Sequence, residues 1–283
     1  MYVVSDRVPA RLATWWTILR ISFEERLIYR GEFALGTLMR FLPIVTQIFL
    51  WKAVFTGMAS GTRGAAPLAG YSYDDMIAYY LLAMIGRAFS SMPGLASGIA
   101  RDIRDGTIKK YLIQPIDMLG FLFLYRLAHK LVYYGVALAP FALVFYLCRG
   151  YFSGWPNAST LAACLASLAM AFVLGFLIEA VLGMVGFWFL EVSSLMWIYM
   201  LLSFFFSGHM FPLDILPGGW ATAVKFVPLN YLAYFPAAVF LGKIQGGELA
   251  WMLGLELGWI VVFLVAVRLT FRFGVRQYGG YGG

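Results

Sequence analysis

Apolar stretches of membrane-spanning length recur along the whole sequence. They cover residues 33–55, 75–98, 119–147, 160–183, 192–207 and 249–269. A helix needs about 20 mostly apolar residues to cross a bilayer, and we expect the short fifth stretch to be completed by its neighbours. Only 12% of the 283 residues are charged, about half of the roughly 25% usual in soluble domains. Because so few charges cannot cover a water-facing surface, the sequence predicts an all-α integral membrane protein, with six transmembrane helices in a single domain over residues 1–283.

Basic residues are unevenly distributed between the two sides of these stretches. An even number of spans places both termini on one side, and that side carries 12 of the 21 Lys and Arg residues: Arg7, Arg11, Arg20, Arg26, Arg30, Arg101, Arg104, Lys109, Lys110, Arg268, Arg272 and Arg276. The other side carries 4: Arg63, Arg149, Lys225 and Lys243. Cytoplasmic segments are enriched in Lys and Arg, so both termini are expected in the cytoplasm. The net charge of +7 therefore indicates orientation in a bilayer, and no nucleic-acid partner is expected.

The segment before the first span, residues 1–32, is amphipathic. Apolar residues recur at helical spacing: Leu12, Trp16, Leu19, Phe23 and Leu27. Charged residues interrupt any apolar core that a signal peptide would need. The pattern predicts a helix lying in the membrane interface, and a cytoplasmic extension of the first span is the alternative.

Residues 99–118, between the second and third spans, are longer than a simple turn requires. Ile99, Ile103, Ile108 and Leu112 offer apolar contacts. The charged residues between them are expected to stay in water: Arg101, Asp102, Arg104, Asp105, Lys109 and Lys110. Gly106 and Pro115 interrupt the helical pattern, and Thr107 follows the glycine. The segment is either a docking element for a soluble partner or an interfacial helix that faces lipid headgroups.

Residues 208–247 are apolar but rich in proline. Gly208 opens the segment, and Pro212, Pro217, Pro228 and Pro236 follow. Proline interrupts helical hydrogen bonding, and non-helical backbone in a membrane must be covered by protein or water. We therefore expect two short helices forming a hairpin that re-enters the membrane from the outer side. A seventh span is the alternative.

Four polar residues lie within the predicted spans: Gln47, Arg87, Glu179 and Glu256. A charge at the centre of a bilayer costs about 2.5–3.5 kcal/mol on insertion scales, so such residues usually face protein or water. Arg87 and Glu179 are expected in the inner half, where they could form an ion pair. The alternatives are a part of a substrate route or an unpaired charge that reaches the interface.

The fifth span is rich in aromatic residues. Tyr199, Ser203, Phe204 and Phe206 are the candidates for lining a route for an amphiphilic substrate, because aromatic side chains fit irregular apolar shapes. Ordinary contact with lipid explains the same residues equally well.

Glycine also recurs at a spacing that permits close helix packing. Gly94–Gly98 and Gly254–Gly258 match the G-x-x-x-G pattern. In a chain with 30 glycines such matches carry little weight.

The sequence contains no Walker A, H-E-x-x-H, C-x-x-C or G-x-S-x-G motif, and no G-x-G-x-x-G after a strand. Gly242-Lys243 is followed by Ile, so it does not complete a Walker A sequence. His129 and His209 are far apart, and Cys148 and Cys164 are expected to be packing residues, so no metal site and no cofactor of this chain are predicted. An intramembrane enzyme acting on lipid, with Glu179 or Glu256 as acid or base, is one alternative function. A non-transporting membrane assembly subunit is another.

Two motifs resemble those of the ABC-2 type transporter permeases, and within them those of a small bacterial branch called the ABC-2 family transporter proteins. They are Ile-Arg-Asp-Gly-Thr-Ile-x-x-x-Leu-x-x-Pro at residues 103–115 and Ser-Gly-x-x-Phe-Pro-Leu-x-x-Leu-Pro at residues 207–217. The resemblance implies a half-transporter in the bacterial cytoplasmic membrane that pairs with a second permease and two ABC ATPase subunits. ATP and Mg²⁺ would bind to the ATPase, and the assembly would export its substrate.

The resemblance also implies roles for segments. Residues 99–118 would carry the helix that couples to the ATPase, through Arg101 to Lys110. Residues 208–247 would be the outer re-entrant hairpin, and the first, second and fifth spans would line the route. Lys109 and Lys110 stand where many relatives have an acidic residue.

Overall fold

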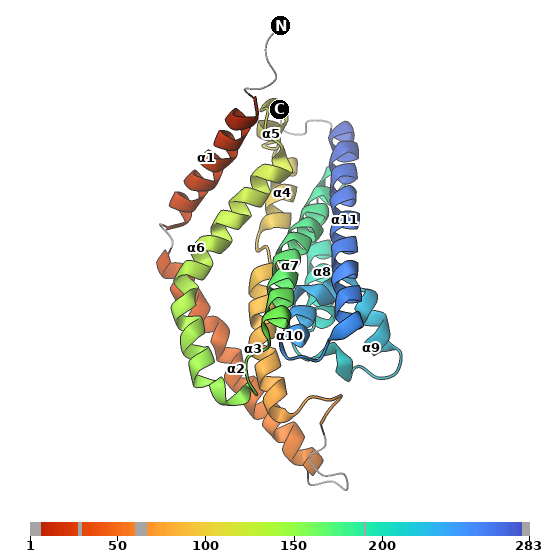
Figure 1. Cartoon of the computed structure of the whole chain (residues 1–283). Helices are drawn as coiled ribbons and strands as arrows, with labels where there is room; N and C mark the ends of the chain where they lie inside the picture. The colour runs from red at the N-terminus through yellow and green to blue at the C-terminus, as the bar shows by residue number, and fades with distance from the viewer. Residues whose placement is uncertain (1–6, 28–29, 60–66, 190, 279–283) are drawn as a thin grey trace. The chain divides into compact units, whose positions relative to one another are not determined.

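The computed structural model describes residues 7–27, 30–59, 67–189 and 191–278 (Figure 1). In these ranges every regular element is a helix, apart from an isolated bridge between Leu68 and Tyr71. The α-helices are α1 (Arg7–Leu27), α2 (Arg30–Ala59), α3 (Tyr73–Ser90), α4 (Leu95–Arg104), α5 (Lys109–Ile113), α6 (Met118–Leu147), α7 (Ala158–Met184), α8 (Ser193–Phe206), α9 (Trp220–Ala223), α10 (Tyr234–Phe240) and α11 (Gly246–Gln277). The predicted all-α fold is confirmed for the described part of the chain.

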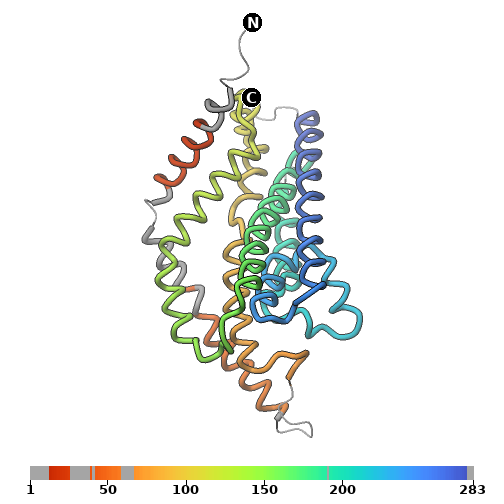
Figure 2. Tube along the Cα trace, in the orientation of Figure 1, coloured from red at the N-terminus to blue at the C-terminus, as the bar shows by residue number. Residues whose placement is uncertain are grey.

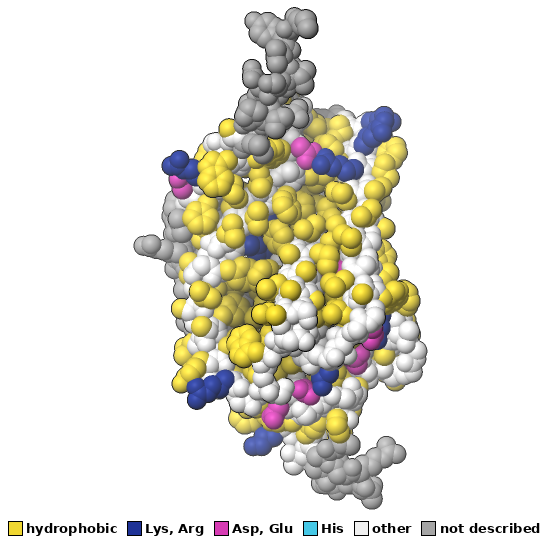
Figure 3. Space-filling view, viewed as in Figure 1, with side chains coloured by type: hydrophobic (Ala, Val, Ile, Leu, Met, Phe, Trp, Pro, Cys, Tyr) yellow, Lys and Arg dark blue, Asp and Glu magenta, His cyan; other side chains and the backbone are white. Residues whose placement is uncertain are grey.

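Three helices in the described ranges are long and apolar enough to cross a membrane. They are Met118–Leu147, Ala158–Phe187 and Gly246–Gln277. Shorter apolar helices cover Leu42–Met58 and Ser193–Phe206. Hydrophobic side chains predominate on the face drawn in Figure 3, and charged ones are few. The protein is therefore a multi-pass membrane protein, whereas the six-span topology and its orientation stay predictions.

The predicted spans differ in how well they match the helices. α6 and α7 coincide with the predicted spans 119–147 and 160–183 to within two residues, and α11 extends beyond 249–269 at both ends. The expectation of one continuous helix over 75–98 was wrong, because α3 ends at Ser90 and α4 begins at Leu95 (Figure 2). Pro93 has no N–H to donate, and Gly94 has a φ of 75°. Both features interrupt a right-handed helix.

The chain forms two compact units. The first comprises residues 1–42 and 108–147, and thus α1, the start of α2, α5 and α6. In this unit α1 packs against α6, and a Cβ at Gly120 would lie 2.8 Å from the Trp15 indole. The Tyr125 hydroxyl of α6 donates a hydrogen bond to Glu25 of α1 (3.3 Å).

α1 falls within residues 1–32, which were predicted to lie in the membrane interface. Trp16 and Phe23 of its predicted apolar face are exposed. The side chains of Leu12 and Leu27 lie outside the described part of the chain. Interfacial placement of this segment stays a prediction.

The second unit comprises Pro43–Thr107 and Cys148–Gly283. α7 is its central helix, and α3, α4, α10 and α11 all pack against it. The boundary between the units falls at Pro43 within α2 and after Thr107, before α5. Each unit has its own packing, and the assignment of one domain to residues 1–283 stays a prediction.

Before α11, residues 208–247 form two short α-helices and three 3₁₀ turns in the second unit. The helices are the four-residue α9 and the seven-residue α10, and the turns cover Leu213–Ile215, Val224–Phe226 and Pro228–Leu232. The helices stay short because Pro212, Pro217 and Pro228 interrupt helical hydrogen bonding. Residues 230–239 are all buried by the rest of the unit. Re-entry into the membrane stays a prediction.

Candidate functional site

The predicted ATPase-coupling residues begin on α4, which packs against glycines of α7. The buried residues of α4 are Leu95, Ala96, Ile99 and Ile103. A Cβ at Gly183 would lie 2.7 Å from the Ala96 carbonyl oxygen and 2.8 Å from Ile99 Cβ. In the turn directly after α7, Val185–Phe187, a Cβ at Gly186 would lie 3.2 Å from Ala100 Cα. Real Cβ atoms essentially never approach another atom within 3.0 Å, so glycine at position 183 is what permits this close contact.

The remaining surface of α4 carries the charged residues. Arg101 and Arg104 are exposed, and Arg104 forms a surface ion pair with Asp105 (3.3 Å). The chain then turns at Gly106, which has a φ of 75°. The Thr107 hydroxyl donates a hydrogen bond to the Asp102 carboxylate (2.9 Å) and so closes the turn. One face of α4 is thus fixed to α7 while its basic face is open.

The second half of the predicted coupling segment, from Ile108 through α5, belongs to the first unit. Ile108 is buried, whereas Leu112 is 38% exposed, so the expected apolar face stops before Leu112. Lys109 and Lys110 are exposed, and Lys110 Nζ lies 4.8 Å from the centre of the Tyr111 ring. Docking of an ATPase by residues 101–110 stays a prediction.

Polar side chains gather where α3 ends. A helix end leaves backbone groups without helical partners, and a membrane offers no water to satisfy them. The Met92 N–H, in the break after α3, donates a hydrogen bond to the Glu179 carboxylate of α7 (3.1 Å). Glu179 therefore stabilises the break that separates α3 from α4.

Arg87 joins α3 to α8 at the same level. Its Nη1 donates a hydrogen bond to Ser203 Oγ (3.1 Å). Tyr199, one turn before Ser203 on α8, interacts with Arg87, Ser203 and Glu179. The structure thus brings Arg87 and Glu179 into one cluster with Tyr199 and Ser203, which we call the break cluster. An ion pair between Arg87 and Glu179 stays a prediction.

The four candidate route residues on α8 do not form one surface. Ser203 is the buried residue of α8, and Tyr199 is half-buried beside it. Phe204 is 42% exposed, and its ring lies 5.6 Å from that of His209. Phe206 is half-buried. Tyr199 and Ser203 thus face the break cluster, and their role in a substrate route stays a prediction.

Gln47 and Glu256 have other surroundings. Gln47 Oε1 on α2 is buried and has no hydrogen-bond partner among the described residues. Glu256 on α11 is fully buried and interacts with Ser167 of α7. Ser167 and Glu179 are 12 residues apart, which is about 18 Å along a helix. Glu179 and Glu256 therefore do not converge, and the alternative of a lipid-modifying acid–base pair gains no support.

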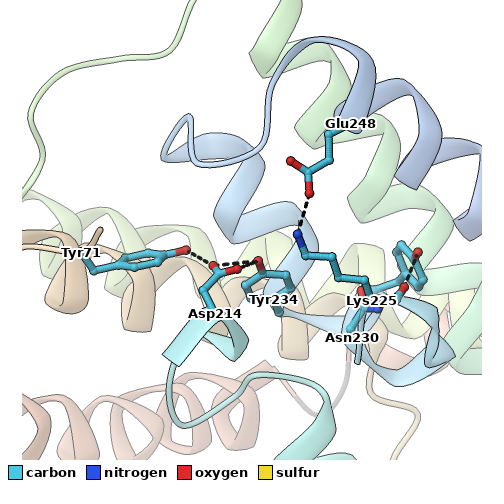
Figure 4. Close-up of polar contacts among 7 residues, drawn as sticks. Tyr71, Asp214, Lys225, Asn230, Tyr234 and Glu248 are labelled. Atoms are coloured by element: carbon cyan, nitrogen blue, oxygen red, sulfur yellow. Dashed lines mark hydrogen bonds and ion pairs between the residues drawn. The ribbon is translucent and has the colours of Figure 1, made fainter. Parts of the chain in front are cut away.

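A second polar network, which the sequence did not single out, joins residues 208–247 to the start of α3. Asp214 accepts hydrogen bonds from the hydroxyls of Tyr71 (3.0 Å) and Tyr234 (2.8 Å). The two hydroxyls point at the carboxylate from opposite sides (Figure 4). Burial and the nearby Asp214 carboxylate raise the pKa of Tyr71, so this hydroxyl remains a donor.

Gly208, at the predicted start of the hairpin, is tightly enclosed. Its φ is 72°, and a Cβ would lie 2.6 Å from both Tyr79 Oη and Tyr234 Cβ. The Tyr79 hydroxyl donates a hydrogen bond to the Gly208 carbonyl oxygen. Because of this φ and these short distances, only glycine fits position 208 without strain. Of the prolines that follow in the predicted hairpin, Pro212 is buried and Pro217 is exposed.

Two lysines in the later part of residues 208–247 form ion pairs with neighbouring helices. Lys243 Nζ contacts Asp75 of α3 (2.9 Å) and the Gly70 carbonyl oxygen (2.8 Å). Lys225 pairs with Glu248 at the start of α11 (2.6 Å; Figure 4). The chain has 17 tyrosines, so Tyr71 and Tyr234 cannot be told apart from ordinary core residues in the sequence. The sequence feature that points to this polar network is Asp214, an acid in an apolar segment.

The model of a family described as ABC-2 family transporter protein matches residues 41–282. No curated protein matches the sequence. The matched region contains α4, the break cluster and the Asp214 network, and its long apolar helices are those expected of a membrane subunit. The chain therefore belongs to the ABC-2 transporter family and is a membrane permease of an ABC transporter.

Proposed function

We propose that this permease is the membrane half of an exporter that moves an amphiphilic or lipid-like substrate from the cytoplasm or inner leaflet. A permease of this family works with a separate ABC ATPase subunit. In the proposed assembly two permeases, identical or similar, join two ATPases, which bind ATP and Mg²⁺. The complex lies in a bacterial cytoplasmic membrane with both permease termini in the cytoplasm.

The observation that carries the proposal is the two-sided character of α4. One side is fixed to α7 through Gly183, where a Cβ would collide with the backbone of α4. The other side presents Arg101 and Arg104. A partner that binds these arginines would transmit its movement to α7, because the α4–α7 contact has no space in which to slip.

Contacts continue from α7 to the other helices of the second unit. Glu179 of α7 accepts a hydrogen bond from Met92, between α3 and α4. Arg87 of α3 donates one to Ser203 of α8. In the proposed mechanism ATP closes the ATPase pair, and α4 binds one ATPase state better than the other. A ligand shifts an equilibrium only through such differential contacts.

The proposed substrate class rests on α8. After its first turn, its exposed side chains are large and apolar: Trp197, Ile198, Met200, Leu201, Leu202, Phe204 and Phe205. Aromatic and methionine side chains adapt to irregular apolar molecules. Ser203 and Tyr199 face the break cluster instead, so the proposed substrate class depends on the exposed apolar side chains of α8.

The test removes the basic face of α4 in a complex of the permease and its co-purifying ATPase. Liposomes containing an NBD-labelled phospholipid report ATP-dependent movement through dithionite quenching. For Arg101→Ala/Arg104→Ala, extended by Lys109→Ala/Lys110→Ala, we expect probe movement to fall while ATP is still hydrolysed. Coupling free energies of about 1–3 kcal/mol correspond to about 5- to 150-fold effects.

Arg272→Ala/Arg276→Ala is the matched control for the α4 pair. Both arginines are exposed at the end of α11, so the control removes the same charge at another site and should leave coupling intact. Unchanged assembly and probe movement in the fourfold variant would rule out the docking role.

A further inference from the structure

Glu256 is a charged-type residue in an unusually enclosed position. It lies on α11, which packs against α7. Its relative exposure is 0%. It belongs neither to the break cluster nor to the Asp214 network, so the proposed export mechanism does not use it.

The Glu256 carboxyl group has no charged partner among the described residues. Both of its oxygens are buried without a hydrogen-bond partner among the described residues. The groups that face it are the Ser167 hydroxyl on α7 and, on the Pro228–Leu232 turn, the Tyr231 hydroxyl. Ser167 Oγ is also without a hydrogen-bond partner there, and the Tyr231 hydroxyl donates to the Lys225 carbonyl oxygen (2.9 Å).

No cation compensates a negative charge at this place in the described ranges. Lys225, whose carbonyl oxygen accepts the Tyr231 hydrogen bond, pairs through its ammonium group with Glu248 (2.6 Å). On α7, the buried residues one turn either side of Ser167 are Cys164 and Ala171. An isolated carboxylate in so apolar a surrounding is strongly disfavoured, and such a group normally becomes neutral.

We propose that Glu256 is a proton-binding site between α7 and α11, which holds its proton while the two helices are packed together. The bound proton makes the carboxyl neutral, so it lies between apolar helices without an ionic partner. Release of the proton requires water or a cation at the carboxylate. Proton loss is therefore tied to opening of the α7–α11 contact.

Infrared spectroscopy of the full-length protein in lipid tests the proposal, because protonated and ionised carboxyl groups absorb at separate frequencies. At neutral pH the wild-type spectrum minus that of Glu256→Gln should contain a protonated-carboxyl C=O band that shifts in D₂O. The matched control is Glu248→Gln, on the same helix. It removes an exposed, lysine-paired acid and should change carboxylate bands alone. Carboxylate bands alone in the Glu256→Gln difference would overturn the proposal.

Stability as a function of pH gives a second readout. In the unfolded chain a glutamate releases its proton near pH 4.3, whereas the folded site retains it. Since the native state then binds more protons, stability falls as pH rises above that value. The wild-type melting temperature should therefore decline with pH more steeply than that of Glu256→Gln, and equal slopes contradict the proposal. Glutamine mimics the neutral acid, so failure of Glu256→Gln to fold would also overturn it.

Discussion

At the scale of single residues, glycine decides how closely the helices of the second unit approach. A Cβ at Gly175 of α7 would lie 2.0 Å from the Ser90 carbonyl oxygen, at the end of α3. At Gly183 the same addition would meet the backbone of α4 at 2.7 Å. Backbone atoms cannot move aside as a flexible side chain can, so these contacts depend on the absence of a side chain.

Gly175→Ala is expected to destabilise the protein. Overpacking at a tight contact typically lowers the free energy of unfolding by about 1–3 kcal/mol. The added methyl group should push α3 and α7 apart. Gly254→Ala on α11 is the control, because its Cβ would meet nothing within 4 Å. Alanine there is expected to be neutral, or stabilising by up to about 1 kcal/mol. Thermal unfolding of the purified protein measures both effects, and equal stability of the two variants would contradict the close contact.

Glu179 acts at the residue scale as an acceptor for the interrupted backbone. Glu179→Leu leaves the Met92 N–H without this acceptor, and an unsatisfied buried donor costs about 1–3 kcal/mol. Glu179→Gln keeps an acceptor oxygen and is expected to retain most of the stability. The unfolding midpoints of the two variants distinguish these cases. An equal loss in both would indicate that the negative charge matters, as in an ion pair with Arg87.

At the scale of elements, the break between α3 and α4 changes how the coupling segment is built. The hydrophobic pattern of residues 75–98 is continuous, so the sequence predicts one span. Pro93 and Gly94 end the helical path, and α4 then packs on the glycines of α7. The break cluster and the coupling helix are thus neighbours because the predicted span is divided.

A disulfide between α4 and the turn directly after α7, Val185–Phe187, tests whether α4 and α7 move together. A Cβ at Gly186 would lie 3.3 Å from Ala100 Cβ, close to the distance of about 3.5–4.5 Å found in disulfides. In a Cys148→Ala/Cys164→Ala background, oxidised Ala100→Cys/Gly186→Cys should form the cross-link. ATP-dependent probe movement should persist, because the proposed mechanism moves α4 and α7 as one body.

The control for this pair is Ser97→Cys/Gly186→Cys. Ser97 is exposed on α4, so this pair should not cross-link efficiently. Probe movement that stops on oxidation of the Ala100→Cys/Gly186→Cys pair and returns on reduction would show instead that α4 slides over α7.

At the scale of the whole molecule, the long apolar helices establish a membrane protein, and the distribution of Lys and Arg predicts its orientation. A Cys148→Ala/Cys164→Ala background carrying Thr107→Cys or Ser153→Cys tests that orientation, because both positions are exposed. A membrane-impermeant maleimide should label Ser153→Cys in spheroplasts and Thr107→Cys in inverted vesicles, since cytoplasmic segments carry the excess of positive charge. Labelling of Thr107→Cys from the outside would remove the basis for ATPase docking.

The sequence by itself determined the class of the protein. Low charge and long apolar stretches require a membrane-embedded helical fold, and the extents of α6 and α7 follow the apolar stretches at 119–147 and 160–183 to within two residues. The motifs at 103–115 and 207–217 resemble those of the family to which the chain belongs. These properties are local, so they can be seen without knowing which helices touch.

The tertiary structure alone decided which glycines lie at tight helix contacts and which groups surround the polar side chains. The G-x-x-x-G pattern singled out Gly98 and Gly254, yet neither has a close neighbour, while Gly175 and Gly183 make the tight contacts. The same holds for Glu179 and Glu256: both were visible as intramembrane acids, but one accepts a backbone N–H and the other is enclosed without a partner among the described residues. Spacing along one helix does not specify its partner helix, because that choice depends on long-range packing.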